Sequence, residues 1–152
     1  MPVYARNILG AAIVGLGLAS QAGASEHDIM TVFKSPTCGC CTSWADAMRS
    51  IGYQVEIVNL DDLSMVKQQA GVPENLEGCH TAVLDGYILE GHVPVQALEI
   101  LLSERPDIRG ISTPGMPAGS LGMGYDPAAK YTVFAFYNDL GQSPTVFYEA
   151  GQ

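Results

Sequence analysis

The sequence predicts an α/β fold in which a strand, a helix and a second strand are followed by a β-hairpin and a further helix. Apolar residues recur at spacings of three and four from Trp44 onward, which is typical of a helix, whereas residues 53–60 alternate between apolar and polar, which is typical of a strand with one buried face. Asp85-Gly86 lies between two apolar runs and indicates a two-residue hairpin turn. With 47% hydrophobic residues, the chain has enough apolar material for a core.

The chain begins with a segment typical of a secretory signal peptide. Arg6 supplies a positive charge, residues 8–18 form an apolar run, and Ala22-Gly23-Ala24 matches a small-residue cleavage site. We therefore expect residues 1–24 to be removed on export to the periplasm and residues 25–152 to form a single domain. A retained N-terminal anchor is the alternative.

The first strand and helix meet at a group of cysteines. Residues 29–33 form a short β-type run, and the helix that ends before Gly52 begins within Cys38-Gly39-Cys40-Cys41. Unpaired N–H groups and the positive end of the dipole at a helix N-terminus stabilise a thiolate, and Lys34 adds a cation nearby. We therefore expect reactive sulfurs at this turn.

The remaining elements follow in a recognisable order. We expect a strand at residues 53–60 and a helix at 63–70 that is capped by Asp61 or Asp62 and ended by Gly71 and Pro73. Further expected elements are hairpin strands at 80–84 and 87–90, a helix at 94–102, and a C-terminal hairpin of residues 131–137 and 145–148. A βαβ unit followed by a hairpin and a helix, with Cys-x-x-Cys opening the first helix, is the thioredoxin-like order.

The four cysteines are compatible with two structural disulfides, because an exported protein folds in an oxidising compartment. Three of them crowd one turn, however, which favours metal or redox chemistry over scattered disulfides. Thioredoxins resemble this chain at Cys38 and Cys41 but carry a cis-proline just before the third strand, where Cys79 stands here. Cys79 is therefore expected to face the turn, so that four sulfurs converge. Cys40 is also unnecessary for simple dithiol exchange.

Four convergent thiolates make a soft-metal site. Cu(I) prefers thiolate and thioether sulfur, and adjacent thiolates can bridge several Cu(I) ions. Zn(II) is the alternative, although the neighbouring Cys40 and Cys41 are poorly placed to reach one tetrahedral ion together. A Pro/Gly loop adds Met116 and Met123 as thioether candidates, with packing on the core as their other explanation. The net charge of −9 argues against nucleic acid or an anionic membrane as a partner.

The two histidines near these motifs have different expected roles. Period-two alternation turns His80 away from the sulfur of Cys79, which predicts a supporting or surface position. His92 precedes Val93-Pro94 at a helix start, where it caps the helix, holds the loop or binds metal, since imidazole is a common copper ligand.

Four ordered motifs resemble the CopG-type family of exported, thioredoxin-fold copper-resistance proteins. They are Lys34-Ser35-Pro36-Thr37-Cys38-Gly39-Cys40-Cys41, Cys79-His80-Thr81-Ala82, Glu90-Gly91-His92-Val93-Pro94 and Pro114-Gly115-Met116-Pro117. The resemblance extends through Met123, with Leu121 and Gly124 in place of a proline and an acidic residue. It implies a copper centre held by Cys38, Cys40, Cys41 and Cys79, together with thiol or copper redox activity.

The sequence thus predicts a periplasmic copper-binding protein of copper homeostasis or resistance. The predicted partners are copper ions and other periplasmic copper-handling proteins. Cys38 and Cys41 are the predicted redox pair, and the predicted metal ligands are Cys38, Cys40, Cys41, Cys79, Met116 and His92. The alternative is a thiol:disulfide oxidoreductase that acts on proteins without a metal.

Overall fold

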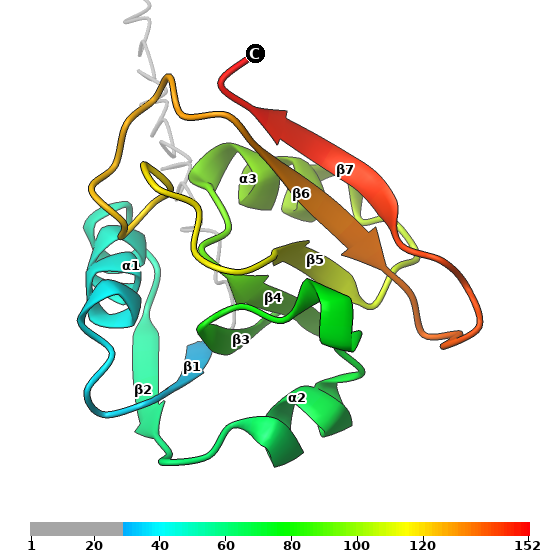
Figure 1. Cartoon of the computed structure of the whole chain (residues 1–152), viewed down its shortest axis with the longest axis horizontal. Coiled ribbons are helices and arrows are strands. Elements are labelled where there is room, and N and C mark those ends of the chain that lie inside the picture. The colour runs from blue at the N-terminus through cyan, green and yellow to red at the C-terminus, as the bar shows by residue number, and fades with distance from the viewer. Residues whose placement is uncertain (1–28) are drawn as a thin grey trace, which may run out of the picture.

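The computed structural model describes residues 29–152, and a seven-stranded sheet runs through this part of the chain (Figure 1). The predicted signal peptide and its cleavage site lie outside the described residues. The elements are β1 (Met30–Lys34), α1 (Gly39–Ser50), β2 (Val55–Asn59), α2 (Ser64–Ala70), the 3-10 helix η1 (Glu74–Leu76), β3 (His80–Leu84), β4 (Tyr87–Gly91), α3 (Val95–Glu104), β5 (Gly110–Thr113), β6 (Tyr131–Phe136) and β7 (Thr145–Ala150).

The order of strands in the sheet is β2-β1-β3-β4-β5-β6-β7. β1 and β2 are parallel, β3 is antiparallel to β1, and β4 is antiparallel to β3, which is the arrangement expected for a βαβ unit followed by a hairpin. The predicted α/β class is therefore confirmed, and the C-terminal hairpin forms as β6 and β7. The order of these elements is the one expected for a thioredoxin-like core.

The strand β5, which joins the core to the C-terminal hairpin, was not predicted from the sequence. This four-residue strand pairs in parallel with β4 and antiparallel with β6. It begins at Gly110, where a Cβ atom would lie 2.1 Å from the carbonyl oxygen of Ile88. A strand this short, with a glycine at its start and one large apolar residue, has too little periodicity to be recognised.

Helices cover both faces of the sheet (Figure 1). On one face, α1 and α3 bury Trp44, Met48, Leu98 and Leu101 against the strands. On the other face, α2 and the segment after it bury a smaller cluster of Ala70, Val72, Leu76, Ile88 and Phe136. This division follows from the alternation of side chains along each strand, since neighbours such as Ile88 and Leu89 must point to opposite faces.

The predicted hairpin turn at Asp85-Gly86 and the predicted helix end at Gly71 are confirmed. Asp85 and Gly86 have φ angles of 50° and 85°, as a type I′ hairpin turn requires. Gly71 ends α2 in the left-handed conformation with φ 74°, as predicted. The predicted cap at Asp61 or Asp62 is wrong, because Leu63 is the N-cap residue, and the Asp62 carboxylate accepts the Ser64 N–H at 2.8 Å from one residue further out. None of the helices within residues 29–152 combines the length and apolarity needed to cross a membrane.

Candidate metal centre

The first turn of α1 holds three cysteines in fixed positions. Cys38 is the N-cap residue, and its sulfur accepts the backbone N–H of Cys41 at 3.3 Å. Its carbonyl oxygen accepts both the N–H and the hydroxyl of Thr42, at 3.3 and 3.2 Å. The predicted placement of the cysteines at a helix N-terminus is confirmed, and the Cys38 sulfur satisfies one of the free N–H donors of the first turn.

The sulfur atoms of all four cysteines gather at this turn. The ligand atoms of Cys38, Cys40, Cys41 and Cys79 lie within 4.8 Å of one another. Cys38 and Cys41 form a disulfide, while Cys40 and Cys79 are free thiols. The sulfur of Cys40 lies 3.5 Å from that of Cys38, so the group holds one oxidised pair beside two reduced sulfurs.

Cys79 reaches this group through close backbone packing. No peptide bond within residues 29–152 is cis, and Cys79 directly precedes β3. A Cβ atom on Gly78 would lie 2.6 Å from the Cα of Gly91, and one on Gly91 would lie 2.4 Å from the carbonyl oxygen of Thr113. The residues that follow these two glycines, Cys79 and His92, are thereby brought together.

His92 contacts the cysteine group, and its two ring nitrogens have different partners. Nδ1 lies 2.7 Å from the carbonyl oxygen of Leu121, which can only accept, so Nδ1 carries the proton. Nε2 lies 3.2 Å from the sulfur of Cys79 and is therefore the unprotonated nitrogen of the neutral ring. Burial lowers the pKa of His92, which favours this neutral form. A lone pair on Nε2 thus faces the cysteines.

His80 is buried, so the alternative of a surface position is wrong. Its ring centroid lies 4.5 Å from that of Trp44 and 5.1 Å from that of His92. Neither ring nitrogen has a hydrogen-bond partner, and burial lowers the pKa of His80 to about 3. His80 therefore packs behind His92 as a neutral ring, in the supporting position that was the other expectation.

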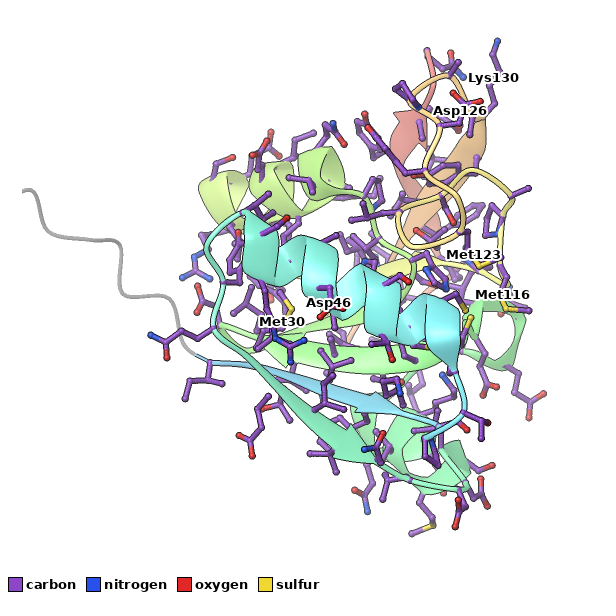
Figure 2. The ribbon with its side chains drawn as sticks, turned by 90° about the vertical axis from the view of Figure 1, so that its left-hand side faces the viewer. Met30, Asp46, Met116, Met123, Asp126 and Lys130 are labelled. Carbon is purple, nitrogen blue, oxygen red and sulfur yellow. A yellow bond between two sulfur atoms is a disulfide. The ribbon has the colours of Figure 1, made fainter. Side chains whose placement is uncertain are left out.

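The Pro/Gly loop lies against the same end of α1. Figure 2 shows Met116 and Met123 beside the N-terminal end of this helix, and Met116 is 59% exposed. The N–H of Gly115 donates to the carbonyl oxygen of Glu77 at 2.9 Å, two residues before Cys79. A Cβ atom on Gly122 would lie 2.7 Å from the carbonyl oxygen of Cys40. The loop therefore borders the cysteine group at both of its ends.

The electrostatics of Cys79 differ from what the helix N-terminus predicts for the other cysteines. Burial, followed by the neighbouring Cys40, raises the pKa of the Cys79 thiol to about 12. The protonated sulfur can donate to Nε2 of His92. Cys79 is therefore a thiol in the metal-free protein, and it must lose its proton before it can bind a metal.

Sequence reasoning missed two groups that complete the site. The indole N–H of Trp44 donates to the carbonyl oxygen of Val93 at 2.9 Å and so ties α1 to the segment that carries His92. The backbone carbonyl of Leu121 fixes the tautomer of His92. Because this second contact uses the backbone, it does not depend on the side chain at position 121, where the chain departs from the family pattern.

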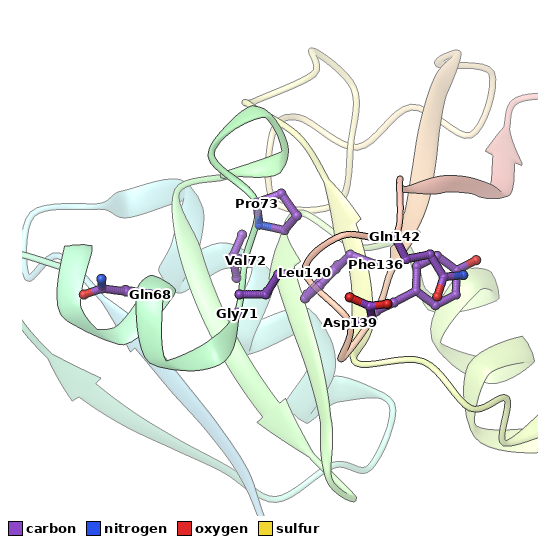
Figure 3. A pocket seen from close by; sticks show the side chains of 9 residues that line it. Gln68, Gly71, Val72, Pro73, Phe136, Asp139, Leu140 and Gln142 are labelled. Atoms are coloured by element: carbon purple, nitrogen blue, oxygen red, sulfur yellow. The ribbon is translucent and has the colours of Figure 1, made fainter.

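A pocket elsewhere on the molecule contains no cysteine. It has a volume of about 290 Å³ and lies between the end of α2 and the turn that joins β6 to β7, with Val72, Phe136 and Leu140 among its walls (Figure 3). Its lining includes no cysteine, histidine or methionine, so it adds nothing to the sulfur site.

The fold and the sulfur group together define an α/β protein of thioredoxin-like order with a cysteine-rich site suited to soft metals. A family model described as "Protein of unknown function, DUF411" matches residues 76–123. Among solved structures, "Copper resistance protein copG- Form 1" shares 34% sequence identity with a TM-score of 0.72 and is matched over 82% of this chain and 98% of its own. "Copper resistance protein copG- Form 2" shares 36% identity with a TM-score of 0.71, over 80% and 96%.

This chain belongs to the CopG family of copper-resistance proteins. The resemblance inferred from the four sequence motifs is confirmed. A search of the curated proteins found no match.

Proposed function

We propose that this protein binds Cu(I) through the sulfurs of Cys38, Cys40, Cys41 and Cys79 when these are reduced, and that it serves copper homeostasis or resistance in the periplasm. The observation that carries the proposal is the convergence of four sulfur atoms within 4.8 Å from two separate parts of the chain. Thiolate sulfur is the ligand that Cu(I) prefers, and the family name points to the same metal.

His92 and Met116 are proposed as additional ligands. Nε2 of His92 presents an unprotonated nitrogen to the cysteine group, 3.2 Å from the sulfur of Cys79. Met116 is exposed on the loop that borders the site, where a thioether suits the capture of Cu(I) from a donor. We assign the two residues different parts, with His92 completing the site and Met116 serving at its entrance.

The distances between the sulfur atoms do not distinguish zinc from copper as the bound metal, so an experiment must decide. In a tetrahedral zinc site with Zn–S bonds of about 2.3 Å, the sulfurs are separated by roughly 3.8 Å. Sulfurs that all lie within 4.8 Å can approach that arrangement, so the neighbouring positions of Cys40 and Cys41 do not by themselves disfavour zinc. The preference for copper rests on ligand softness and on the family.

A redox step is part of the proposal. The Cys38–Cys41 pair is positioned to cycle between dithiol and disulfide. Oxidation of the two thiols to one disulfide releases two electrons and two protons, and two Cu(II) ions take up these electrons to become two Cu(I) ions. Such a step would couple the reduction of copper to the thiol state of the protein.

Thiol:disulfide exchange with other proteins is the second candidate function. The disulfide between Cys38 and Cys41 at a helix N-terminus favours it, because dithiol exchange needs only an attacking and a resolving sulfur. Cys40 and Cys79 have no part in that reaction, so their presence in the same group favours metal binding.

An anaerobic titration of the reduced protein with Cu(I), followed by native mass spectrometry, tests the proposal. We expect more than one Cu(I) per chain and a release of protons, because the thiols must be deprotonated before they bind. Tight binding of a single Zn(II) without any preference for Cu(I) would overturn the choice of metal. Efficient reduction of protein disulfides without metal binding would favour the second candidate.

A further inference from the structure

A fully buried carboxylate lies next to the segment that carries Cys79. Glu90 on β4 has no exposed surface, and its carboxylate accepts three donors. These are the Lys67 ammonium, the Gly78 N–H at 2.7 Å and the Thr81 hydroxyl at 2.7 Å. The three donors come from α2, from the segment before β3 and from β3 itself. One side chain on β4 therefore joins α2 to the stretch of chain at the start of β3.

The bond to Gly78 links Glu90 to the metal centre. Gly78 directly precedes Cys79, and its N–H is fixed by Oε1 of Glu90 while its Cα packs against Gly91. On the strand that bears Glu90, Gly91 is followed by His92, whose ring faces the sulfur of Cys79. The carboxylate therefore anchors the backbone just before β3 begins, at the residue that precedes Cys79.

The ion pair with Lys67 explains how a carboxylate can occupy this position. Both side chains are buried, and the ammonium of Lys67 also donates to the hydroxyl of Thr81 at 3.3 Å. Replacing a buried ion pair with apolar residues of similar volume is often neutral or stabilising. Stability alone thus gives little reason for charges here, whereas a carboxylate can accept the Thr81, Lys67 and Gly78 donors at once.

We propose that Glu90 is the positioning residue for Cys79, and that Lys67 holds Glu90 in place. This inference rests on the proposed function only where copper is concerned. Independently of copper, a hydrogen-bond acceptor at position 90 keeps the Gly78–Cys79 segment against the cysteine turn. When that acceptor is removed, Cys79 moves away from the other sulfurs while α1 keeps Cys38, Cys40 and Cys41 in place.

Two double variants, both without charge at positions 67 and 90, separate the effect of the hydrogen-bond acceptor at position 90 from the effect of the charges. Lys67→Met with Glu90→Gln removes both charges but keeps a side-chain oxygen for the Gly78 N–H. Lys67→Met with Glu90→Met removes the charges and the acceptor together. Leu101→Ala in the core of α3 serves as the destabilised control, because Leu101 is fully buried and takes no part in the hydrogen bonds of Glu90. Circular dichroism identifies conditions in which all of these proteins are folded.

The main measurement does not involve copper. Each reduced, metal-free full-chain protein is treated briefly with iodoacetamide, and mass spectrometry gives the labelling of Cys79 relative to Cys40 in the same molecule. We expect the Gln variant and Leu101→Ala to stay near the wild-type ratio, and the Met variant to exceed it about tenfold, as local opening exposes Cys79. Equal ratios in the two double variants would overturn the inference.

A copper measurement then separates this inference from the proposed function. Chelator competition should show Cu(I) affinity falling by about 10- to 100-fold in the Met variant and little in the Gln variant. If the wild type binds no Cu(I), the proposed function fails while the labelling ratio still decides the role of Glu90. If the Met variant does not fold, Glu90→Asp replaces it, since a carboxylate that is one methylene shorter draws back from Gly78 and should also raise the ratio.

Discussion

Nε2 of His92 lies 3.2 Å from the sulfur of Cys79, and this contact joins the two strands that end at the cysteine group. His92 follows β4 and Cys79 precedes β3, so the contact bridges the open ends of the β3–β4 hairpin. The other ring nitrogen is occupied by the carbonyl of Leu121. The nitrogen that faces the sulfurs is therefore the one with a free lone pair, and this arrangement can be tested by substitution.

His92→Asn should weaken copper binding without unfolding the protein. The Asn side-chain N–H can replace the bond that Nδ1 makes with Leu121, but the variant has no nitrogen at the position of Nε2. We expect Cu(I) affinity, measured by chelator competition, to fall by about 10- to 100-fold. His92→Gln, which places its amide nearer to the Nε2 position, is the matched comparison. Wild-type affinity in His92→Asn would show that the ring acts only through Leu121.

Cys79→Ser should reduce the number of Cu(I) ions bound by the reduced protein, or their affinity, because Cys79 supplies the sulfur opposite α1. The secondary structure should survive, as judged by circular dichroism. Stability is compared between the reduced, metal-free wild type and variant, where no disulfide contributes. If Cys79→Ser binds copper like the wild type under these conditions, the four-sulfur site is wrong.

Oxidation of the Cys38–Cys41 pair should lower copper binding, and a thiol reductant should restore it. A disulfide leaves neither sulfur as a thiolate, so two of the four ligands are lost. Native mass spectrometry before and after reduction measures the change in bound Cu(I). Undiminished binding by the oxidised protein would place the copper site elsewhere in the molecule.

Gly122→Ala should destabilise the reduced, metal-free protein by about 1–3 kcal/mol in urea unfolding, because of the strained backbone. The residue has a φ of +87°, and its Cβ atom would lie 2.7 Å from the carbonyl oxygen of Cys40. Gly39→Ala, in the first turn of α1 next to Cys40, is the control, since a Cβ atom there would meet nothing within 4 Å. We expect no loss of stability in the control. Equal stability of both variants would show that the loop yields freely at Gly122.

Acid should destabilise the metal-free protein partly through His80. The pKa of this ring is about 3 in the folded protein because of burial, whereas an unfolded histidine has a pKa of about 6.5. Between these values the unfolded chain binds the additional proton. Stability is therefore complete above about pH 6.5 and falls by up to about 1.4 kcal/mol per pH unit as the pH decreases toward 3.

Urea unfolding of reduced wild type and His80→Phe at several pH values between 7 and 4.5 measures this contribution. The variant keeps an aromatic ring against Trp44 but cannot titrate. We expect its stability to depend less steeply on pH than that of the wild type. Parallel pH profiles for the two proteins would contradict the expectation.

The sequence by itself determined the elements whose signals are local. Gly71 and the Asp85-Gly86 turn end or connect their elements through backbone conformations that few other residues adopt, so they were predicted where they occur. The start of α1 at the cysteines was also predicted, because capping is a contact between residues close in sequence. The order of these elements then predicted the core of the sheet.

Only the tertiary structure decided the contacts between distant segments. Gly78 and Gly91 pack backbone against backbone, which places Cys79 beside His92, and no pattern along the chain records such an approach. His80 was expected at the surface or in support, and burial against Trp44 decided between the two. Glu90 lies in one of the sequence motifs, but only the fold places its carboxylate between Lys67 and Gly78. Side-chain periodicity predicts which face a residue occupies, but its partners are set by the packing of elements far apart in sequence.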